Sequence, residues 1–593
     1  MSRMFLVWCT RVLLFLPVSG LISNRNSDDG IWSYDCVRDE IGRGEQRCAR
    51  QDKASSSGGL ELTLEVCKLI CGQYGQLWPL PKARFVQLGN STRQFLLSSF
   101  TVKSQLSPSS ELEAMVNEAA QRISQLASML HPEYPFSEDK SNPLHRSPVD
   151  SASVSSVEVR VRVVSDSLFG YGLDESYSLS ITSTPKKVLV VILAETFFGA
   201  RHGLETLLQC MAYDSRSDSL RIIETVTIDG DSPDYQHRGL SLDSSRSYTP
   251  IPLLKKIIDA MGMNKMNILH WHITDTHSFP FQPPRRPLVG LYGAYSPRHV
   301  YYPEDVRDLV HFARVRGVKI IPELDAPSHC GNEPPCGQLN PVNENVYDVL
   351  EDLYADFLDV FDGDIFHMGG DEVMIPSWNK TDHETVEILE YLSTMKWDRN
   401  DPQSFVKLWG DVFQKKAFER LRNLRENITA ILWTSELTNP SHVEEYLHKD
   451  DYIIQLWTDS QAPSIAQLAK QGYRLIFTNY DAWYLDCGFA AWVGSGHNWC
   501  SPYKELRKQI QGGEVAMWAE QTDEHNVETK IWPRASAMAE RLWSNPETGY
   551  EAAEARIQQH RDRMAKFGIG SELLQPEFCR QNEGLCYLSN DAP

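Results

Sequence analysis

The sequence predicts an α/β protein: a (β/α)8 barrel of the TIM type, preceded by a smaller α+β domain with an antiparallel sheet. Three observations predict it. From Arg238 onward, short apolar runs alternate with helical segments over roughly 330 residues, as in such a barrel. Upstream, strand-like runs follow one another with few helices between them. Acidic and aromatic residues recur after the barrel strands, at the end where these barrels carry their functional sites.

The barrel prediction depends on eight apolar runs of strand length. The helix predicted at 303–316 illustrates the intervening segments, because Val306, Leu309, Val310 and Ala313 fall on one helical face. Residues 479–513 give only a short helical signal. The predicted strands span about 238–243, 266–270, 318–322, 364–368, 429–433, 452–457, 473–478 and 514–518. The predicted helices span about 250–262, 303–316, 345–360, 402–425, 440–448, 464–471 and 532–543.

The upstream domain has a different pattern. Residues 110–130 form an amphipathic helix with an apolar stripe from Leu112 to Leu130. Alternating valines at 157–163 predict a half-buried strand, and Tyr177, Leu179 and Ile181 repeat that period. Further strands are predicted at 188–193 and 221–228. The expected domains are a signal peptide at 1–22, a cysteine-containing segment at 23–75, the α+β domain at 76–230, and the barrel with a C-terminal extension at 231–593.

Net charge and targeting signals indicate which partners and which cellular location to expect. A net charge of −21 and a pI near 5.3 leave no basic footprint, so nucleic acid is not an expected partner. The mostly apolar stretch 4–22 contains Arg11 and Pro17 and ends near small residues, which is typical of a secretory signal peptide, with a signal anchor as the alternative. No membrane span is expected in the mature chain. We therefore expect a secreted or lysosomal protein.

Cysteines and sequons agree with that expectation. Disulfides are typical of oxidising compartments, and three local pairs are predicted, with two further bridges among the four N-terminal cysteines. Cys210 lies on the apolar face of a predicted helix, which indicates a buried free thiol. The three local pairs are Cys330 with Cys336, Cys487 with Cys500, and Cys579 with Cys586. N-glycosylation sequons stand at Asn90, Asn379 and Asn427.

Acids and aromatics gather at one end of the predicted barrel. Asp371 and Glu372 follow the fourth strand directly after two glycines, a residue type that allows close backbone approach to a ligand. A solvated acidic turn is the alternative for that pair taken alone. Carboxylates among tryptophans suit a sugar, since the apolar face stacks on indole and the hydroxyls bind acids. The other strand-end residues include Asp275, His329, Trp433, Trp457, Tyr484, Asp486, Trp518 and Glu520.

A metal site is a second interpretation of this end of the barrel. His270 and His272 are two residues apart on one strand, so both side chains point to the same face and could bind a metal. No third ligand follows at a characteristic spacing. Imidazoles hydrogen-bonded to nearby acids are therefore the favoured interpretation, and no metal and no cofactor is expected.

The adjacent acids bear on the mechanism. Glycoside hydrolysis usually takes two carboxylates that flank the bond, about 5–5.5 Å apart for retention and about 6.5–9.5 Å for inversion. Neighbouring residues at a strand end diverge and do not readily flank one bond. One can still act as the general acid while the other orients a 2-acetamido group, whose own oxygen attacks the anomeric carbon.

Several ordered motifs carry a family resemblance. They are His237-Arg238-Gly239-Leu240, His270-Trp271-His272-Ile273-Thr274-Asp275, Asp325-Ala326-Pro327-Ser328-His329 and His367-Met368-Gly369-Gly370-Asp371-Glu372. With the segment 198–206 and Trp532-Pro533-Arg534, they resemble the β-N-acetylhexosaminidases of glycoside hydrolase family 20. The resemblance runs from about Leu77 to Leu588 and is greatest to insect enzymes that degrade chitooligosaccharides.

The resemblance implies roles for individual residues. Glu372 would be the general acid and base, Asp371 would orient the acetamido group, and Tyr484 would hydrogen-bond the acetamido oxygen. The predicted strand nevertheless starts at Arg238, which places that residue at the opposite end of the barrel from the acids. Trp433, Trp457 and Trp518 would wall the sugar, Trp499 would stack a second sugar, Arg238, Asp486 and Glu520 would bind hydroxyls, and Asp275 and His329 would support the acids.

Two departures from the family pattern leave alternatives open. The loops at 330–336 and 500–512 are shorter than is usual in the insect enzymes, and both fall near the mouth of the expected site. The expected function is exo-cleavage of terminal N-acetylglucosamine, or N-acetylgalactosamine, from chitooligosaccharides or glycoconjugates. The alternatives are an impaired sugar-binding paralogue or isoform and, from the histidine pair, a metal-dependent hydrolase. A homodimer is a further expectation from the family.

Overall fold

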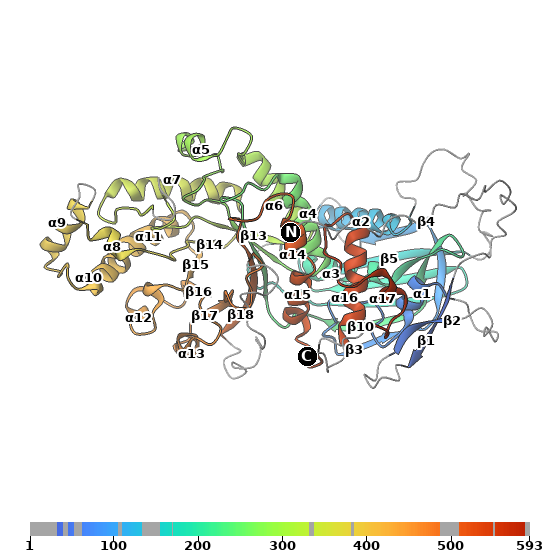
Figure 1. Cartoon of the computed structure of the whole chain (residues 1–593). Coiled ribbons are helices and arrows are strands. Elements are labelled where there is room, and N and C mark those ends of the chain that lie inside the picture. Colours follow the sequence, from blue (N-terminus) through green and yellow to red (C-terminus); the bar gives the residue numbers. More distant parts are fainter. Residues whose placement is uncertain are drawn as a thin grey trace, which may run out of the picture.

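The computed structural model describes residues 32–38, 46–51, 62–104, 110–132, 154–168, 170–330, 337–380, 385–486, 509–549 and 552–586. The barrel and the sheet domain lie side by side, with the C-terminal helices α15 (Arg534–Ser544) and α16 (Glu554–Lys566) between them (Figure 1). Residues 1–22, the expected signal peptide, lie outside the described ranges. Among the described residues, no helix is both long and apolar enough to cross a bilayer.

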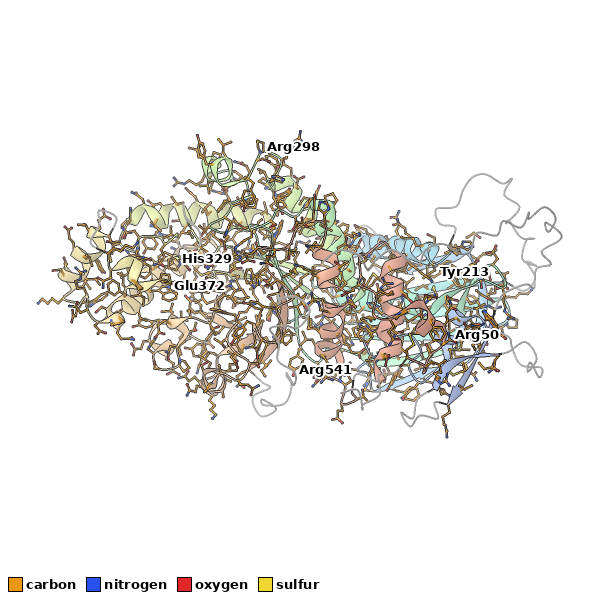
Figure 2. The ribbon with its side chains drawn as sticks, in the orientation of Figure 1. Arg50, Tyr213, Arg298, His329, Glu372 and Arg541 are labelled. Carbon is orange, nitrogen blue, oxygen red and sulfur yellow. A yellow bond between two sulfur atoms is a disulfide. The ribbon has the colours of Figure 1, made fainter. Side chains whose placement is uncertain are left out.

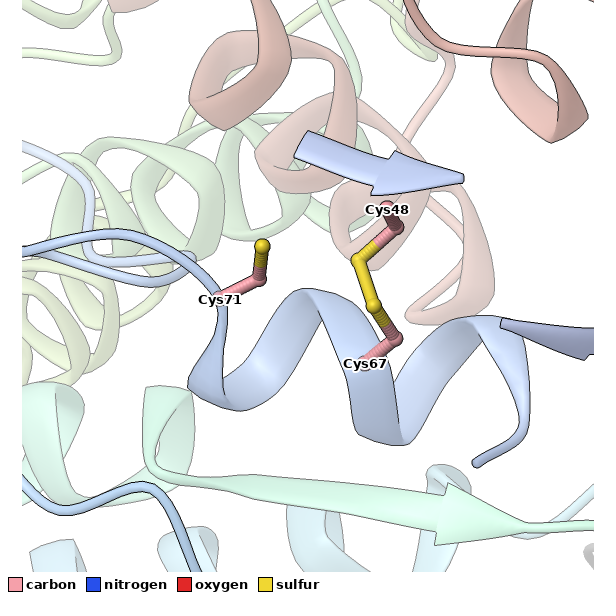
Figure 3. A group of neighbouring side chains, drawn as sticks. All are labelled: Cys48, Cys67 and Cys71. Carbon is pink, nitrogen blue, oxygen red and sulfur yellow. A yellow bond between two sulfur atoms is a disulfide. The ribbon is translucent and has the colours of Figure 1, made fainter. Parts of the chain in front are cut away.

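Disulfides hold the N-terminal segment together. Its two short strands pair antiparallel and lie against one helix: β1 (Ser33–Arg38), β2 (Gln46–Gln51) and α1 (Leu64–Ile70). Cys36 is bonded to Cys71, and Cys48 to Cys67, which are the two bridges expected among these four cysteines. Figure 3 shows the second bridge joining β2 to α1. The crowding of Cys48, Cys67 and Cys71 is therefore explained by disulfides.

The second domain is an eight-stranded mixed sheet, in the order β3-β10-β6-β7-β5-β4-β9-β8. The expected antiparallel sheet needs this refinement, because β5 pairs parallel to both β4 and β7. Helix α2 lies between β4 and β5 in the chain and makes the crossover that a parallel pair needs. The strands are β3 (Phe85–Leu88), β4 (Thr92–Ser104), β5 (Ser155–Val163), β6 (Tyr177–Ser183), β7 (Lys187–Ala194), β8 (Met211–Asp214), β9 (Ser219–Ile223) and β10 (Val226–Asp231).

Two helices cover this sheet. Helix α2 (Glu111–Met129) begins where the Ser110 hydroxyl accepts a hydrogen bond from the Glu113 N–H at 3.0 Å. Its predicted apolar stripe is buried together with the valines of β5. Helix α3 (Phe197–Gln209) is buried over nearly its whole length, and Cys210 at its end is a buried free thiol, as predicted.

The barrel closes from eight parallel strands in chain order. All eight lie where the apolar runs predicted them, with end points shifted by a few residues. One isoleucine from each of six neighbouring strands joins a buried cluster in the barrel interior, from Ile268 to Ile476. The strands are β11 (His237–Asp243), β12 (Ile268–His272), β13 (Lys319–Glu323), β14 (Ile365–His367), β15 (Thr429–Trp433), β16 (Tyr452–Leu456), β17 (Arg474–Phe477) and β18 (Ile510–Met517).

The helices around the barrel match the predicted ones and add others. The predicted 402–425 helix is continuous but contains a π-helical stretch, η1 (Leu408–Gln414), between α10 (Pro402–Lys407) and α11 (Lys415–Leu424). The other predicted helices are α4 (Ile251–Met263), α6 (Pro303–Val315), α7 (Glu344–Val360), α12 (Val443–Tyr446), α13 (Pro463–Lys470) and α15 (Arg534–Ser544). The additions are α5 (Pro287–Gly293), α8 (Ile375–Trp378), α9 (Val386–Met395), a 3-10 turn η2 (Glu436–Thr438), α14 (Val527–Ile531), α16 (Glu554–Lys566) and α17 (Glu577–Gln581).

Buried polar contacts join the two domains. Asp231 at the end of β10 accepts a hydrogen bond from the Trp543 indole at 2.9 Å and pairs with Lys265 at 3.0 Å. All three side chains are at most 1 % exposed. Because a buried charge is tolerated only when it is paired, this contact fixes how the sheet domain sits on the barrel.

Candidate active site

The turn after β14 brings the two adjacent acids to the rim of the barrel. Gly369 and Gly370 have φ of 65° and 87°, and Glu372 also lies in the left-handed region at 50°. A Cβ on Gly369 would stand 1.9 Å from Asp325 Oδ1, so this position requires glycine. The Gly370 N–H donates to the same carboxyl oxygen at 2.7 Å. The backbone therefore turns sharply at this point, and His329 Nε2 lies 3.8 Å from Asp371 Oδ2 and 3.4 Å from Glu372 Oε2.

Glu372 lies against a histidine. His329 Nε2 is 3.4 Å from Glu372 Oε2, and Figure 2 shows the two side chains next to each other in the barrel half of the molecule. The His329 contact lowers the pKa of Glu372, although its partial burial opposes that shift. Burial lowers the pKa of His329, but the nearby carboxyl groups of Asp275 and Glu372 outweigh this and raise it to about 12. The Glu372 side chain is 54 % exposed and accessible to a ligand.

Asp371 has a different environment. Its side chain is only 17 % exposed, and within the described structure its Oδ1 has no hydrogen-bond partner. Burial, and then the negative charge of Asp371, raise the pKa of Asp325 well above its usual range. Asp325 and Asp371 each have a carboxyl oxygen within 4.8 Å of the other, so the buried Asp325 side chain restricts the orientation of Asp371.

His329 is supported by a second acid. Asp275 Oδ2 lies 3.1 Å from His329 Nδ1 and 3.0 Å from a guanidinium nitrogen of Arg246. Burial raises the pKa of Asp275, but hydrogen bonds with His272 and His329 outweigh it and lower the pKa strongly. Asp275 is therefore a carboxylate in direct contact with the ring of His329.

Aromatic side chains line the floor and wall of the site. The Trp433 indole N–H donates to Glu323 at 2.7 Å, which anchors that buried ring. The Trp518 ring centroid lies 6.0 Å from Trp433 and 6.1 Å from Tyr484. Trp457 is fixed by its indole N–H, which donates to the Thr434 carbonyl at 2.6 Å. Trp433, Trp518 and Tyr484, which follow three different strands, thus lie in one cluster, and Trp457 is held against Thr434, the residue after Trp433.

Arg238 does not belong to this site, and that assignment is corrected. It lies at the start of β11, fully buried, with its side chain pointing out of the barrel toward the sheet domain. Its guanidinium pairs with Glu175 and donates to the carbonyls of Lys265 and Tyr235 at 2.9 and 2.8 Å. Alternation along the strand directs its neighbour His237 into the barrel and Arg238 away from it.

Arg246, which the sequence interpretation missed, is the arginine that lies at the rim of the barrel beside the acids. It follows the carboxyl end of β11 in a turn capped by Asp243, with a 3.1 Å ion pair to that residue. Its guanidinium lies 5.3 Å from the Trp518 ring centroid and 4.0 Å from Glu520, which is half exposed. The sequence feature that could have indicated Arg246 is a basic residue shortly after the end of a predicted strand, where the functional sites of such barrels lie.

The remaining predicted residues divide into four groups. Asp486 is the last described residue before a gap, directly after Leu485, whose N–H donates to Ala516 of β18 at 2.8 Å. Cys579 is bonded to Cys586, as predicted. Among the sequons, Asn90 and Asn427 are exposed and Asn379 is partly exposed. Trp499, Cys336, Cys487, Cys500 and most of the two short loops lie outside the described residues.

The predicted disulfide between Cys330 and Cys336 is wrong for Cys330, and Cys336 lies outside the described residues. Cys330 is a free thiol, and its Sγ lies 2.7 Å from the Asp325 carbonyl and 3.0 Å from that of Ser328. His329 has a φ of 53°, and the chain turns there so that the sulfur faces inward. Local cysteine spacing alone could not predict this direction.

A (β/α)8 barrel with acids and aromatic rings at the carboxyl ends of its strands is typical of glycoside hydrolases, and the comparisons place the protein in that class. Comparisons identify the family. Residues 235–333 and 331–546 match the model of the glycosyl hydrolase family 20 catalytic domain, and residues 77–210 match a β-acetyl hexosaminidase-like domain. The chain belongs to glycoside hydrolase family 20.

Similar proteins align with this chain over nearly its full length. The chain is 40 % identical to the chitooligosaccharidolytic β-N-acetylglucosaminidase of Ostrinia furnacalis, covering 98 % of this chain and 100 % of that one. It is 39 % identical to the enzyme of the same name from Bombyx mori, covering 97 % and 98 %. Among solved structures, a chitobiase from Flavobacterium johnsoniae aligns with a TM-score of 0.62 at 25 % identity, covering 83 % and 73 %.

Proposed function

We propose that this protein is an exo-acting β-N-acetylhexosaminidase. It releases terminal non-reducing N-acetylglucosamine, or N-acetylgalactosamine, from chitooligosaccharides or glycoconjugates, with retention of configuration. The observation that carries the proposal is the division of the two adjacent acids. Both acids lie near His329, but the Glu372 side chain is 54 % exposed, whereas Asp371 is 17 % exposed and lies beside the buried carboxyl of Asp325.

The proposed reaction has two steps. Glu372 donates its proton to the glycosidic oxygen while the acetamido oxygen of the substrate attacks the anomeric carbon, which gives an oxazolinium intermediate and expels the leaving alcohol. Glu372 then takes a proton from water, which attacks the same carbon from the face that the leaving group left. Two displacements at one carbon retain its configuration.

Asp371 and Tyr484 act on the acetamido group in this proposal. The Asp371 carboxylate accepts a hydrogen bond from the acetamido N–H and stabilises the positive charge that develops there. The Tyr484 hydroxyl donates to the acetamido oxygen. Bound sugar excludes water from Glu372, and desolvation raises the carboxyl pKa toward the value that a general acid needs.

The rest of the site positions the sugar. Trp433, Trp457 and Trp518 pack on its apolar faces, while Arg246, Asp486 and Glu520 bind its hydroxyls. This assignment places Arg246 in the role first expected for Arg238, because Arg246 contacts Asp275 and the Trp518 ring. Trp499 remains a candidate for stacking the second sugar.

Substitution of Glu372 tests the proposal. Glu372→Gln should lower the cleavage of an aryl N-acetyl-β-glucosaminide by about 100-fold or more, because the amide cannot donate the required proton. Glu419→Gln, on the outer helix α11, is the matched control and should retain full activity. Near wild-type turnover by Glu372→Gln would overturn the assignment. Sugar binding by the wild-type protein without any turnover would favour the impaired-paralogue alternative.

Secretion and dimer formation are separate proposals. Three disulfides among the described residues support folding in an oxidising compartment. N-terminal sequencing of protein recovered from the medium should find a start near residue 23, whereas retention of residues 1–22 would indicate an anchor. Light scattering on the purified protein distinguishes a homodimer from a monomer.

A further inference from the structure

Besides the isoleucine cluster, the barrel interior carries a layer of ionisable side chains. Every member is fully buried, although a barrel core is normally filled by apolar side chains. Charges in such a place are tolerated only when they are paired. The inward-facing members are His237, His270, Glu323, His367 and Glu514. Gly239 makes room for this layer, since a Cβ there would stand 2.4 Å from the Glu514 side chain.

These groups form one alternating series of imidazoles and carboxylates. It starts near the sheet domain, where the Tyr171 hydroxyl lies 2.9 Å from His237. It continues from His237 to Glu514 at 2.6 Å, from Glu514 to His270 at 2.9 Å, and from His270 to Glu323 at 3.0 Å. It reaches the rim from Glu323 to His272 at 2.6 Å, from His272 to Asp275 at 3.0 Å, and from Asp275 to His329 at 3.1 Å.

His272 is the link between the buried layer and the site. Its Nδ1 faces Glu323 and its Nε2 faces Asp275, so both ring nitrogens lie against carboxylates. The pKa of Glu323 and that of Asp275 are both lowered, and an ionised carboxylate cannot donate, so both contacts can be hydrogen bonds only if the ring is a doubly protonated imidazolium. Burial lowers the pKa of His272, but Glu323 and Asp275 outweigh it and hold the pKa well above its usual range.

We propose that His272 is a positioning residue for the catalytic acid, acting through Asp275 and His329. Its charged ring holds the Asp275 oxygen that also contacts His329, and offsets part of the charge on that carboxylate. His329 is thereby presented to Glu372 in a fixed orientation and protonation state. The inference rests on the proposed role of Glu372 and adds the source of its alignment inside the barrel.

The charged groups around His272 determine in which direction its substitution should shift the pH dependence of activity. A neutral side chain at position 272 leaves the negative charge of Asp275 less compensated, so the proton shared by His329 and Glu372 is held to higher pH. The basic limb of the activity profile should therefore move upward. The groups that face His272 are Glu323 from β13, Asp243 from β11, Asp275 and Arg246 from the rim, His270 on its own strand, and the Trp518 ring at 5.2 Å.

The test compares two buried histidines of one strand. The Gln side chain in His272→Gln retains a donor toward Asp275 but no charge, and His270→Gln makes the same change one link farther from the site. For His272→Gln we expect kcat to fall by about tenfold or more with little change in KM, and the basic limb to rise by about half a pH unit or more. His270→Gln should shift the limb less.

Several outcomes overturn the inference. An unshifted profile for folded His272→Gln would do so, as would equal shifts for both variants, which indicate a merely structural role. If His272→Gln does not fold, neutron diffraction on the wild-type protein at neutral pH decides: two deuterons on the His272 ring support the inference, and one overturns it. Full activity of Glu372→Gln would instead refute the proposed function, so the two failures are distinguishable.

Discussion

Two arginines eight residues apart should respond to substitution in opposite ways. Arg238→Met removes a fully buried guanidinium that pairs with Glu175, donates to two carbonyls and lies 5.1 Å from the Trp543 ring. Glu175 would remain buried, with its ion pair to Arg238 lost. Breaking a buried pair on one side typically costs about 3–5 kcal/mol, so the free energy of unfolding should fall by that amount.

Arg246→Met should act on catalysis instead. Its guanidinium is at the rim, 3.0 Å from Asp275, and we assign it to the sugar hydroxyls. Hydrogen bonds to a charged group contribute about 1.5–3 kcal/mol, which corresponds to a loss of about 10- to 100-fold in kcat/KM. Arg238→Met, measured on folded protein, should keep kcat/KM within a few-fold of wild type.

Denaturant unfolding and steady-state cleavage of an aryl N-acetyl-β-glucosaminide measure the two effects on the same preparations. Arg238→Met should lose stability and keep activity when folded, whereas Arg246→Met should lose activity. This expectation would be refuted if Arg238→Met lost activity without losing stability while Arg246→Met retained full activity, because Arg238 would then be the sugar-binding residue.

Three further predictions follow from buried geometry. Burial lowers the pKa of His270, but Glu514 and Glu323 outweigh it and raise the pKa to about 9, above the unfolded value of about 6.5. The protonated ring therefore stabilises the fold by on the order of 3 kcal/mol below about pH 6.5, and this stabilisation is lost as pH rises through 9. In thermal unfolding measured as a function of pH, His270→Gln should lack this pH-dependent loss of stability. Gly369→Ala places a Cβ against Asp325 at positive φ and should abolish activity, whereas Gly363→Ala, where a Cβ meets nothing closer than 3.5 Å, should not. Chelator should leave activity unchanged, because the nitrogens of His270 and His272 face carboxylates, and strong inhibition would revive the metal interpretation.

The barrel could be predicted because its strands are local signals. Each apolar run is bounded by turn residues and long enough for one strand, so the eight runs were found without knowledge of their partners. The smaller sheet was predicted less completely, because β5 pairs parallel to β4 and β7, and pairing is a non-local property. Alternation within β5 predicts which face is buried and says nothing about its neighbours.

The same limit applies to the site. Asp371 and Glu372 could be found because glycines and acids at a strand end form a local pattern. Arg238 was misplaced because a motif match does not tell which end of a strand a side chain occupies, although its position at the start of the predicted strand already pointed away from the acids. The partnership of Asp325 with Asp371 depends on a contact across 46 positions of sequence, which only the fold reveals.

The central claim is that the acetamido oxygen of the substrate, and not a protein carboxylate, attacks the anomeric carbon. The most direct measurement is kcat/KM for a series of aryl β-glycosides whose 2-acetamido group carries zero, one, two or three fluorines. If the acetamido oxygen is the nucleophile, electron withdrawal weakens it and the rate should fall steeply with each fluorine. A rate that hardly changes across the series would contradict the account and indicate Asp371 or Glu372 as the nucleophile.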